Sequence, residues 1–184
     1  YIGDWSSDVC SSDLSSATKA SCTVSIGFDD EMIESMARLS NTTKQAIIKD
    51  AKKSGLKYSK KRINGTIYHM FISTIKNSSF KDIEDNLNST SGFSNVCISK
   101  NYFFATFNPS ALTVSTSGLS DEAMDLSSFY LNMKITFKSK VNFTNGTVSK
   151  DGKTVSWIIK DADKATRLCA STTKVNKTDR KSVV

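Results

Sequence analysis

Residues 131–157 read LNMKITFKSKVNFTNGTVSKDGKTVSW, and this stretch decides the fold. Apolar and polar residues alternate over residues 131–138, which is the pattern of a β-strand with one buried face. Two further apolar residues, Val141 and Phe143, predict that the strand continues to an Asn-Gly turn at residues 145–146. An Asp-Gly turn follows, and the alternation resumes behind it on a return strand. The stretch therefore predicts antiparallel hairpins with one apolar face.

The preceding part of the chain combines further strands with short helices. Asn64-Gly65 stands between two extended runs and predicts a hairpin, because both residue types tolerate positive φ. Thr42 with Gln45 fits a capping box, which predicts the start of a helix. The fold class that follows is α+β, a mostly antiparallel sheet built from hairpins with two or three short helices toward the N-terminal half. We expect strands near residues 22–28, 56–63, 66–75, 93–99, 102–107, 131–143, 155–159 and 167–173, and helices near residues 32–39, 43–53 and 80–87.

The two ends of the chain resemble the translated arms of a sequencing adapter. The words in question are GDWSSDVCSSDL, which ends at Leu14, and DRKSVV, which begins at Asp179. DNA that can encode residues 10–14 has a reverse complement that can encode residues 179–182, as a linker ligated to both ends of a fragment would. Such segments are set aside before fold reasoning. We therefore expect residues 1–14 and 178–184 to be adapter-derived, residues 15–177 to form a single domain, and the native protein to continue past both ends.

Positive charge is the main property of the surface that the sequence reveals. The formal net charge is +7, and it becomes +9 without the end segments, because residues 1–14 hold three aspartates and residues 179–184 hold one Asp with Arg180 and Lys181. A net charge of this size favours anionic surfaces through the summed field. Most lysines are scattered among carboxylates, which is typical of a solvated surface. The tight cluster is Lys57, Lys60, Lys61 and Arg62, for which we predict contact with an anionic surface.

Three cysteines remain outside the end segments, namely Cys22, Cys97 and Cys169. They lie far apart, form no C-x-x-C pair and are accompanied by the single histidine His69, so the sequence disfavours a zinc site. Each lies in an apolar strand pattern, which predicts buried thiols. A disulfide between two of the three is the alternative in an oxidising compartment.

The sequence contains no catalytic motif that we recognise, such as G-x-S-x-G, a phosphate-binding glycine loop or H-E-x-x-H. His69 shares a strand face with Ile67 and Phe71, and we expect a structural role for it. The aromatic run at residues 102–107 could stack nucleic-acid bases or line an apolar pocket, but packing in the core is favoured because no nucleic-acid motif accompanies it. We therefore predict no catalytic residues, no cofactor, no metal and no nucleic-acid partner.

The pattern of turns and apolar positions in residues 131–157 resembles the C-terminal part of the LppM-like domain of bacterial envelope lipoproteins. Residues 47–73, IIKDAKKSGLKYSKKRINGTIYHMFIS, are similar to the helix, glycine, strand and hairpin of that family, and residues 166–173, TRLCASTT, to its closing strand. The resemblance covers most of residues 22–173. It implies a lipidated cysteine upstream, often a membrane helix downstream, and no active-site residue.

These expectations combine into one functional hypothesis. The chain would be the extracytoplasmic domain of a bacterial cell-envelope lipoprotein, would not be an enzyme, and would bind a lipid or glycolipid on the outer side of the membrane. The cluster from Lys57 to Arg62 would attract anionic headgroups. One alternative is a structural or protein-interaction module that holds an envelope protein by a sheet edge, and another is an enzyme with an unrecognised site.

Overall fold

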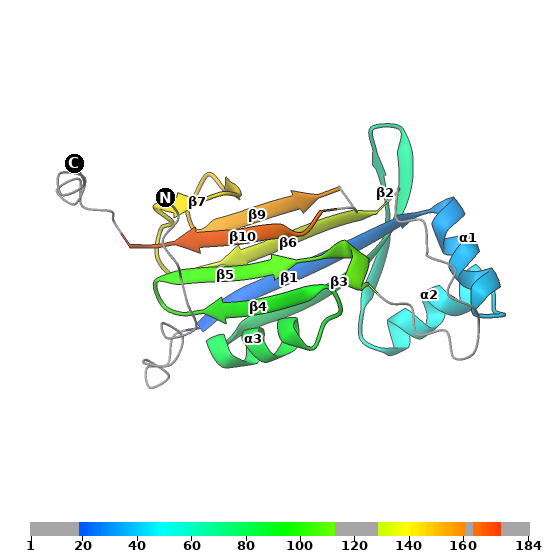
Figure 1. Cartoon of the computed structure of the whole chain (residues 1–184), viewed down its shortest axis with the longest axis horizontal. Helices are drawn as coiled ribbons and strands as arrows, with labels where there is room; N and C mark the ends of the chain where they lie inside the picture. Colours follow the sequence, from blue (N-terminus) through cyan, green and yellow to red (C-terminus); the bar gives the residue numbers. More distant parts are fainter. Residues whose placement is uncertain (1–18, 113–128, 161–163, 174–184) are drawn as a thin grey trace.

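The computed structural model describes residues 19–112, 129–160 and 164–173, and these form an α+β fold as predicted (Figure 1). The two segments that we interpret as adapter-derived, residues 1–14 and 178–184, lie outside the described residues. Residues 113–128 also lie outside them.

The described residues form the predicted strands and helices, but β1 and β3 are longer than predicted and the strands after Thr136 differ. The strands are β1 (Lys19–Asp29), β2 (Lys57–Ile63), β3 (Thr66–Ser79), β4 (Phe93–Ile98), β5 (Tyr102–Phe107), β6 (Tyr130–Thr136), β7 (Phe143–Thr144), β8 (Thr147–Val148), β9 (Thr154–Ile159) and β10 (Thr166–Ser171). The helices are α1 (Asp30–Leu39), α2 (Lys44–Lys53) and α3 (Phe80–Asn88), with a short 3-10 turn at Pro109–Ala111.

These strands divide into two antiparallel sheets, a division that the sequence did not predict. The large sheet has the order β2-β3-β1-β6-β9-β8, and the small sheet has the order β4-β5-β10-β7. Every strand pair in both sheets is antiparallel. Figure 1 shows the small sheet lying over one part of the large sheet, with α1 and α2 at the other end, beyond β1.

The core lies between the two sheets. Leu131, Met133 and Ile135 on β6 are fully buried, as their alternation with polar residues predicts. They belong to the same apolar cluster as Phe103 and Phe107 on β5 of the small sheet. Burying one such side chain contributes about 1.5–3 kcal/mol relative to leaving it in water. The sheets are therefore held together mainly by the apolar faces that the sequence pattern marks.

The predicted continuation of the β6 strand through Val141 and Phe143 is wrong. β6 ends at Thr136, after which β7 pairs with β10 of the small sheet and β8 pairs with β9 of the large sheet. Phe143 is 57% exposed, so its apolar character does not mark a buried face. The chain crosses between sheets here, and the one-dimensional alternation carries no signal for such a crossing.

The three helices begin at side-chain caps. Asp29 caps α1 by accepting a hydrogen bond from the backbone N–H of Met32 at 2.8 Å, as its position predicts. The predicted box of Thr42 with Gln45 is wrong by one residue, because Thr43 is the cap of α2 and accepts from the N–H of Ala46 at 3.2 Å. Neighbouring threonines offer the same hydroxyl, and only the backbone geometry selects between them. α3 has a complete capping box formed by Ser79 and Asp82.

Two cysteines of the core region are free thiols. Cys22 is buried in β1, and burial raises the pKa of its thiol to about 12. Cys169 in β10 is half-buried and also free. Because neither is bonded, no disulfide joins any two of Cys22, Cys97 and Cys169. The prediction of a buried thiol is confirmed for Cys22 and is wrong for Cys169, which is half-buried, and for Cys97, which is disulfide-bonded.

Candidate anion-binding surface

The four cations predicted to contact an anionic surface lie on β2, at the edge of the large sheet. All four are exposed. Successive side chains of a strand point to opposite faces, so the strand does not gather them on one side. Lys60 pairs with His69 of β3, whereas Lys61 pairs with Tyr68, and these partners lie on opposite faces of the sheet. Lys57 and Lys61 therefore point to one face, and Lys60 and Arg62 point to the other.

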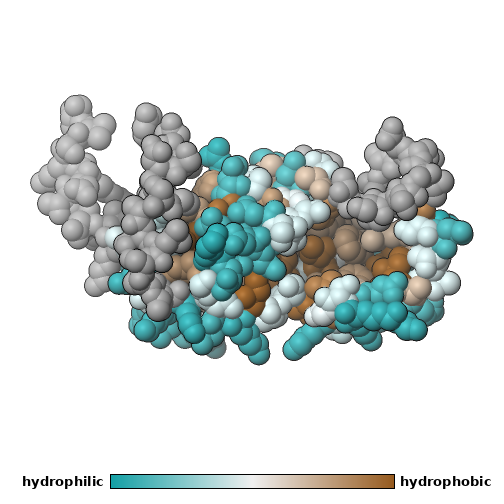
Figure 2. Space-filling view, turned by 90° about the horizontal axis from the view of Figure 1, so that it is seen from below, coloured by the Kyte–Doolittle hydropathy of each residue, from teal (hydrophilic) through white to brown (hydrophobic). Residues whose placement is uncertain are grey.

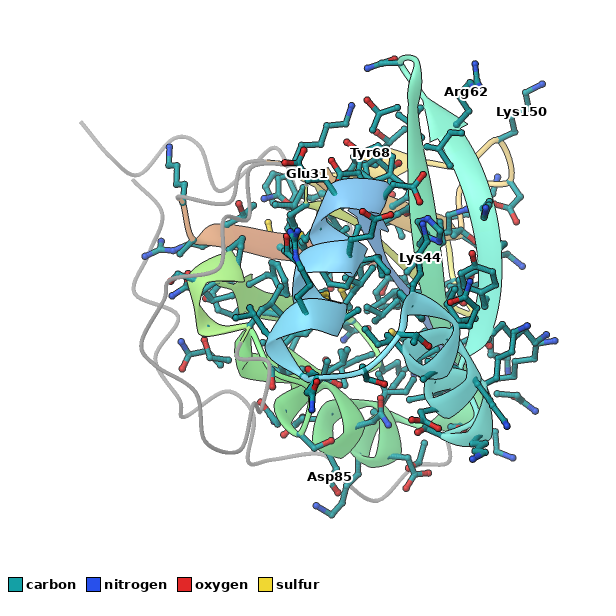
Figure 3. The ribbon with its side chains drawn as sticks, turned by 90° about the vertical axis from the view of Figure 1, so that its right-hand side faces the viewer. Glu31, Lys44, Arg62, Tyr68, Asp85 and Lys150 are labelled. Carbon is teal, nitrogen blue, oxygen red and sulfur yellow. The ribbon has the colours of Figure 1, made fainter. Side chains whose placement is uncertain are left out.

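The structure adds α2 to this set. Residues 44–62, from the start of α2 nearly to the end of β2, contain eight lysines and arginines and one aspartate, so they carry as much net charge as the whole chain. α2 leads through a short turn at Gly55 into β2, and the two elements lie on the same side of the molecule (Figure 3). Counting charge in a sliding window, rather than looking for adjacent cations, would have found this segment. We call Lys49, Lys52, Lys53, Lys57, Lys60, Lys61 and Arg62 the basic strip.

Most cations of the basic strip have no carboxylate beside them. Lys53 lies 3.6 Å from Asp50, and Lys44, which is not part of the strip, pairs with Asp30. For the other six members no carboxylate of the described residues lies within 4.0 Å. Unneutralised charges that share one surface add their fields and raise the local concentration of anions. The strip is therefore an electrostatic attractor for anionic ligands.

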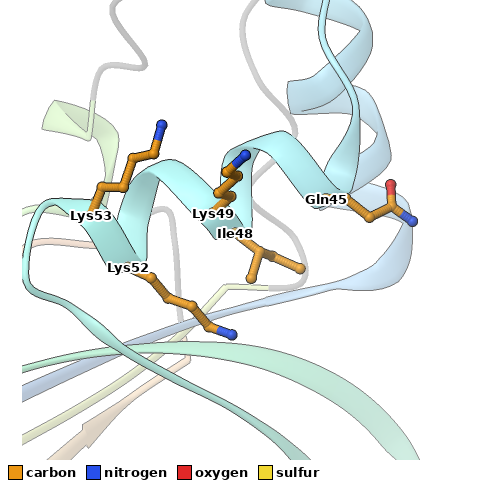
Figure 4. Close-up of a pocket in the computed structure, with 5 residues that line it drawn as sticks. All are labelled: Gln45, Ile48, Lys49, Lys52 and Lys53. Carbon is orange, nitrogen blue, oxygen red and sulfur yellow. The ribbon is translucent and has the colours of Figure 1, made fainter.

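A cavity of about 480 Å³ lies against α2 at one end of the strip. Figure 4 shows Ile48 and Lys52 pointing from the helix toward the sheet, while Lys53 points away from it. The ammonium of Lys52 lies 5.3 Å from the centre of the Tyr58 ring on β2, which is the geometry of a cation–π contact. The described residues that line the cavity are Gln45, Ile48, Lys49, Lys52 and Lys53. Its wall therefore contains both an apolar side chain and ammonium groups.

A row of aromatic rings runs from Tyr58 into the core. The Tyr58 ring lies 5.8 Å from the Phe71 ring, and Phe71 lies 6.3 Å from Phe28. Phe28 in turn lies 6.4 Å from Phe129 of the core cluster. Seen from below, the molecule shows apolar atoms between the hydrophilic groups at the positions of α3 and α2 (Figure 2). The basic strip is thus adjacent to an apolar zone.

His69 sits beside the strip as the buried member of a hydrogen-bonded network. The side chain has no exposed surface, and its Nδ1 and Nε2 lie 2.8 Å from the Tyr58 hydroxyl and the Asp30 carboxylate, respectively. Asp30 also binds the ammonium of Lys44. Hydrogen bonds from Lys44 and then His69 lower the pKa of Asp30 to about 2, so its carboxylate accepts both bonds near neutral pH.

The Tyr58–His69–Asp30 arrangement has the order of a nucleophile, a base and an orienting acid, but its chemistry favours a structural role. Desolvation by burial raises the pKa of Tyr58, which makes phenolate formation harder. In the neutral imidazole Nε2 donates to Asp30, and Nδ1 accepts from the Tyr58 hydroxyl. The network links β2, β3, α1 and, through Lys44, α2. It therefore fixes the positions of α2 and β2, the two elements that carry the basic strip.

The other candidate groups from the sequence are placed as follows. Phe103 and Phe107 are buried in the core, which contradicts a base-stacking role for them, while Tyr102 and Phe104 are half-buried. Within residues 19–112, 129–160 and 164–173, no three His, Cys, Asp or Glu side chains are grouped so that they could hold a metal ion. Across the same ranges, no helix combines the length and apolar character needed to cross a membrane.

Comparisons with known proteins give no relative. No protein-family model, curated protein or solved structure matches the chain. The resemblance to the LppM-like domain stays a prediction.

Proposed function

We propose that this chain is a non-enzymatic, extracytoplasmic domain of a bacterial envelope lipoprotein and that it binds an anionic lipid or glycolipid. The observation that carries the binding proposal is the basic strip, which concentrates the net charge of the chain on α2 and β2. Six of its cations have no carboxylate beside them among the described residues, so they are available to a ligand.

The apolar surroundings of the strip favour an amphipathic ligand over a simple ion. Ile48 lines the cavity together with lysines, and the row of rings from Tyr58 to Phe129 leads away from it. An anionic headgroup on the lysines would leave its apolar part next to Ile48. Burial of apolar surface contributes about 25 cal/mol per Å². Even a small buried apolar area therefore adds to the binding free energy that the electrostatic attraction supplies.

Binding to vesicles tests the proposal. We expect the protein to sediment with vesicles that contain phosphatidylglycerol and not with pure phosphatidylcholine vesicles, and salt to weaken the binding. The double variant Lys60→Glu, Arg62→Glu and the double variant Lys49→Glu, Lys52→Glu should each reduce binding severalfold. Their matched control is Lys138→Glu, Lys140→Glu, which makes the same charge change at exposed positions just after β6.

The location of the control pair follows from the sheet register. Thr136 at the end of β6 pairs with Ser21 near the start of β1, whereas α1 follows the end of β1. The control lysines therefore lie at the opposite end of the large sheet from α1. Equal loss in the control and strip variants, or no binding by the unaltered protein, would overturn the lipid proposal.

The envelope location needs its own test. We expect protease to digest the full-length gene product when it is added to cells whose wall has been removed and whose membrane is intact. Protection of the protein until the membrane is lysed would overturn the extracytoplasmic placement.

A protein-interaction module is the second candidate, and one observation favours it. Among the described strands β2 pairs only with β3, so none of them occupies its other edge, where a further strand could add. The cations on β2 oppose this reading, because charged residues on an edge strand are a common device against strand addition. Crosslinking in cells that captures protein at β2, with no vesicle binding in vitro, would favour this second candidate.

A further inference from the structure

We propose that the ligand of the basic strip is an extended polyanion, a chain that carries phosphates at regular intervals, rather than a single headgroup. This inference rests on the proposed function and specifies the ligand chemistry of the same site. It is argued from how the fold distributes the cations.

The pleat of β2 sends its cations to both faces of the sheet. Lys57 and Lys61 lie on one face, and Lys60 and Arg62 lie on the other. A flat membrane surface, or one compact headgroup, that reaches the first pair cannot also reach the second without wrapping around the edge. Because β2 is the outermost strand of the large sheet, nothing among the described strands blocks that edge. A flexible chain lying along it can contact both pairs.

The spacing of the cations suits a repeating ligand. Residues two apart on a strand are separated by about 6.6–6.8 Å, so Lys60 and Arg62 present charges at that interval. On α2, Lys49 and Lys53 are four residues apart and are therefore neighbours on the helix surface, about 5–6 Å apart at Cβ, whereas Lys52 points toward the sheet. The strip therefore offers charges at similar intervals along two consecutive elements.

Multivalent contact predicts a steep dependence on salt. Each phosphate that displaces counterions contributes about −0.7 to the slope of log K against log salt for a flexible chain. With four or more contacts the slope would be about −3 or steeper. A single headgroup held by one or two lysines would give a slope of about −1.

Titration with long-chain polyphosphate and with pyrophosphate, at several salt concentrations, tests the inference. We expect the polymer to bind at least tenfold more tightly per phosphate than pyrophosphate, with the steep slope. Equal affinity per phosphate, or a slope near −1 for the polymer, would overturn the proposal.

Two double variants test whether both faces take part. Lys57→Glu with Lys61→Glu and Lys60→Glu with Arg62→Glu should each weaken polymer binding at least fivefold, whereas the control Lys138→Glu with Lys140→Glu should not. Loss from one face alone would overturn the polyanion and indicate a one-sided site. The corresponding Gln pairs, checked by thermal unfolding, serve if a Glu pair disturbs folding.

The vesicle assay separates this inference from the function on which it rests. Binding to phosphatidylglycerol vesicles without preference for polyphosphate over pyrophosphate would contradict the polyanion proposal. The lipid proposal would still hold. Polymer binding without vesicle binding would sink the lipid proposal and support a soluble polyanion as the ligand.

Discussion

The indole Nε1 of Trp157 donates a hydrogen bond to Oδ1 of Asn145 at 2.8 Å. The same oxygen accepts from the backbone N–H of Cys169 at 3.0 Å, and the Asn145 amide nitrogen donates to the carbonyl of Arg167 at 2.7 Å. Trp157 belongs to the large sheet, whereas Cys169 and Arg167 belong to the small one. One side chain in the crossing between β7 and β8 thus joins the two sheets. A Cβ at Gly146 would lie 2.7 Å from the same indole nitrogen, so the next residue must be glycine.

We expect Asn145→Ala to destabilise the fold by about 2–4 kcal/mol, because it leaves polar groups at the sheet junction without partners. Urea unfolding followed by Trp fluorescence measures this loss. Trp157→Phe removes one of the hydrogen bonds and keeps much of the buried ring, so it should cost less than Asn145→Ala. Asn88→Ala, at an exposed position near the end of α3, is the control and should change stability by no more than about 0.5 kcal/mol. Equal effects of Asn145→Ala and Asn88→Ala would contradict the junction role.

Replacement of His69 should be more costly than replacement of its phenolic partner. His69→Phe leaves the Tyr58 hydroxyl without its partner and removes one hydrogen bond to the half-exposed Asp30 carboxylate, and we expect a loss of about 1–3 kcal/mol. Tyr58→Phe removes one bond and leaves the ring in place, for which about 1 kcal/mol is expected. Thermal and urea unfolding measure both. If Tyr58→Phe costs as much as His69→Phe, the hydroxyl has a role beyond this hydrogen bond.

Stability should depend on pH through Asp30. The pKa of this carboxyl is lowered to about 2 in the folded state, chiefly by the hydrogen bond from Lys44 and then by that from His69. Its contribution is therefore complete above the unfolded pKa of about 3.9 and is lost as the pH falls toward 2. Because about half of the Asp30 side chain is exposed, solvent screens the interaction and we expect about 1 kcal/mol or less. In Asp30→Asn the stability lost between pH 5 and pH 2 should be smaller than in the unaltered protein, and an identical loss would contradict the assignment.

Thiol labelling should distinguish the two free cysteines. Cys22 is 2% exposed and burial raises its pKa to about 12, so in the native protein it should react with a thiol reagent only through unfolding. Cys169 is half-buried and should react earlier. In the Cys169→Ser variant the slow labelling of Cys22 can be followed by itself. Its rate should rise with urea in parallel with the population of the unfolded state. Rapid labelling of Cys22 in the native state would show that β1 opens locally.

Several elements could be predicted because their signals are local. The alternation over residues 131–138 marks the buried face of β6, and Asn64-Gly65 marks the hairpin, where both residues have positive φ as the turn requires. The Ser79 cap and the spacing of Ile83 and Leu87 mark α3 and its buried side. In each of these the interacting groups lie within a few residues of one another in the sequence. A local sequence pattern is therefore enough to predict how they are arranged.

Tertiary structure decided what depends on groups far apart in the chain. The bond between His69 and Asp30 spans 39 residues, and the bond between Asn145 and Cys169 spans 24. The split into two sheets depends likewise on which strands become neighbours. By itself the sequence determined which side of each strand is apolar and how much positive charge the chain carries. The alternation along a strand does not identify the strand that pairs with it. The arrangement of the site therefore depends on how the strands pack.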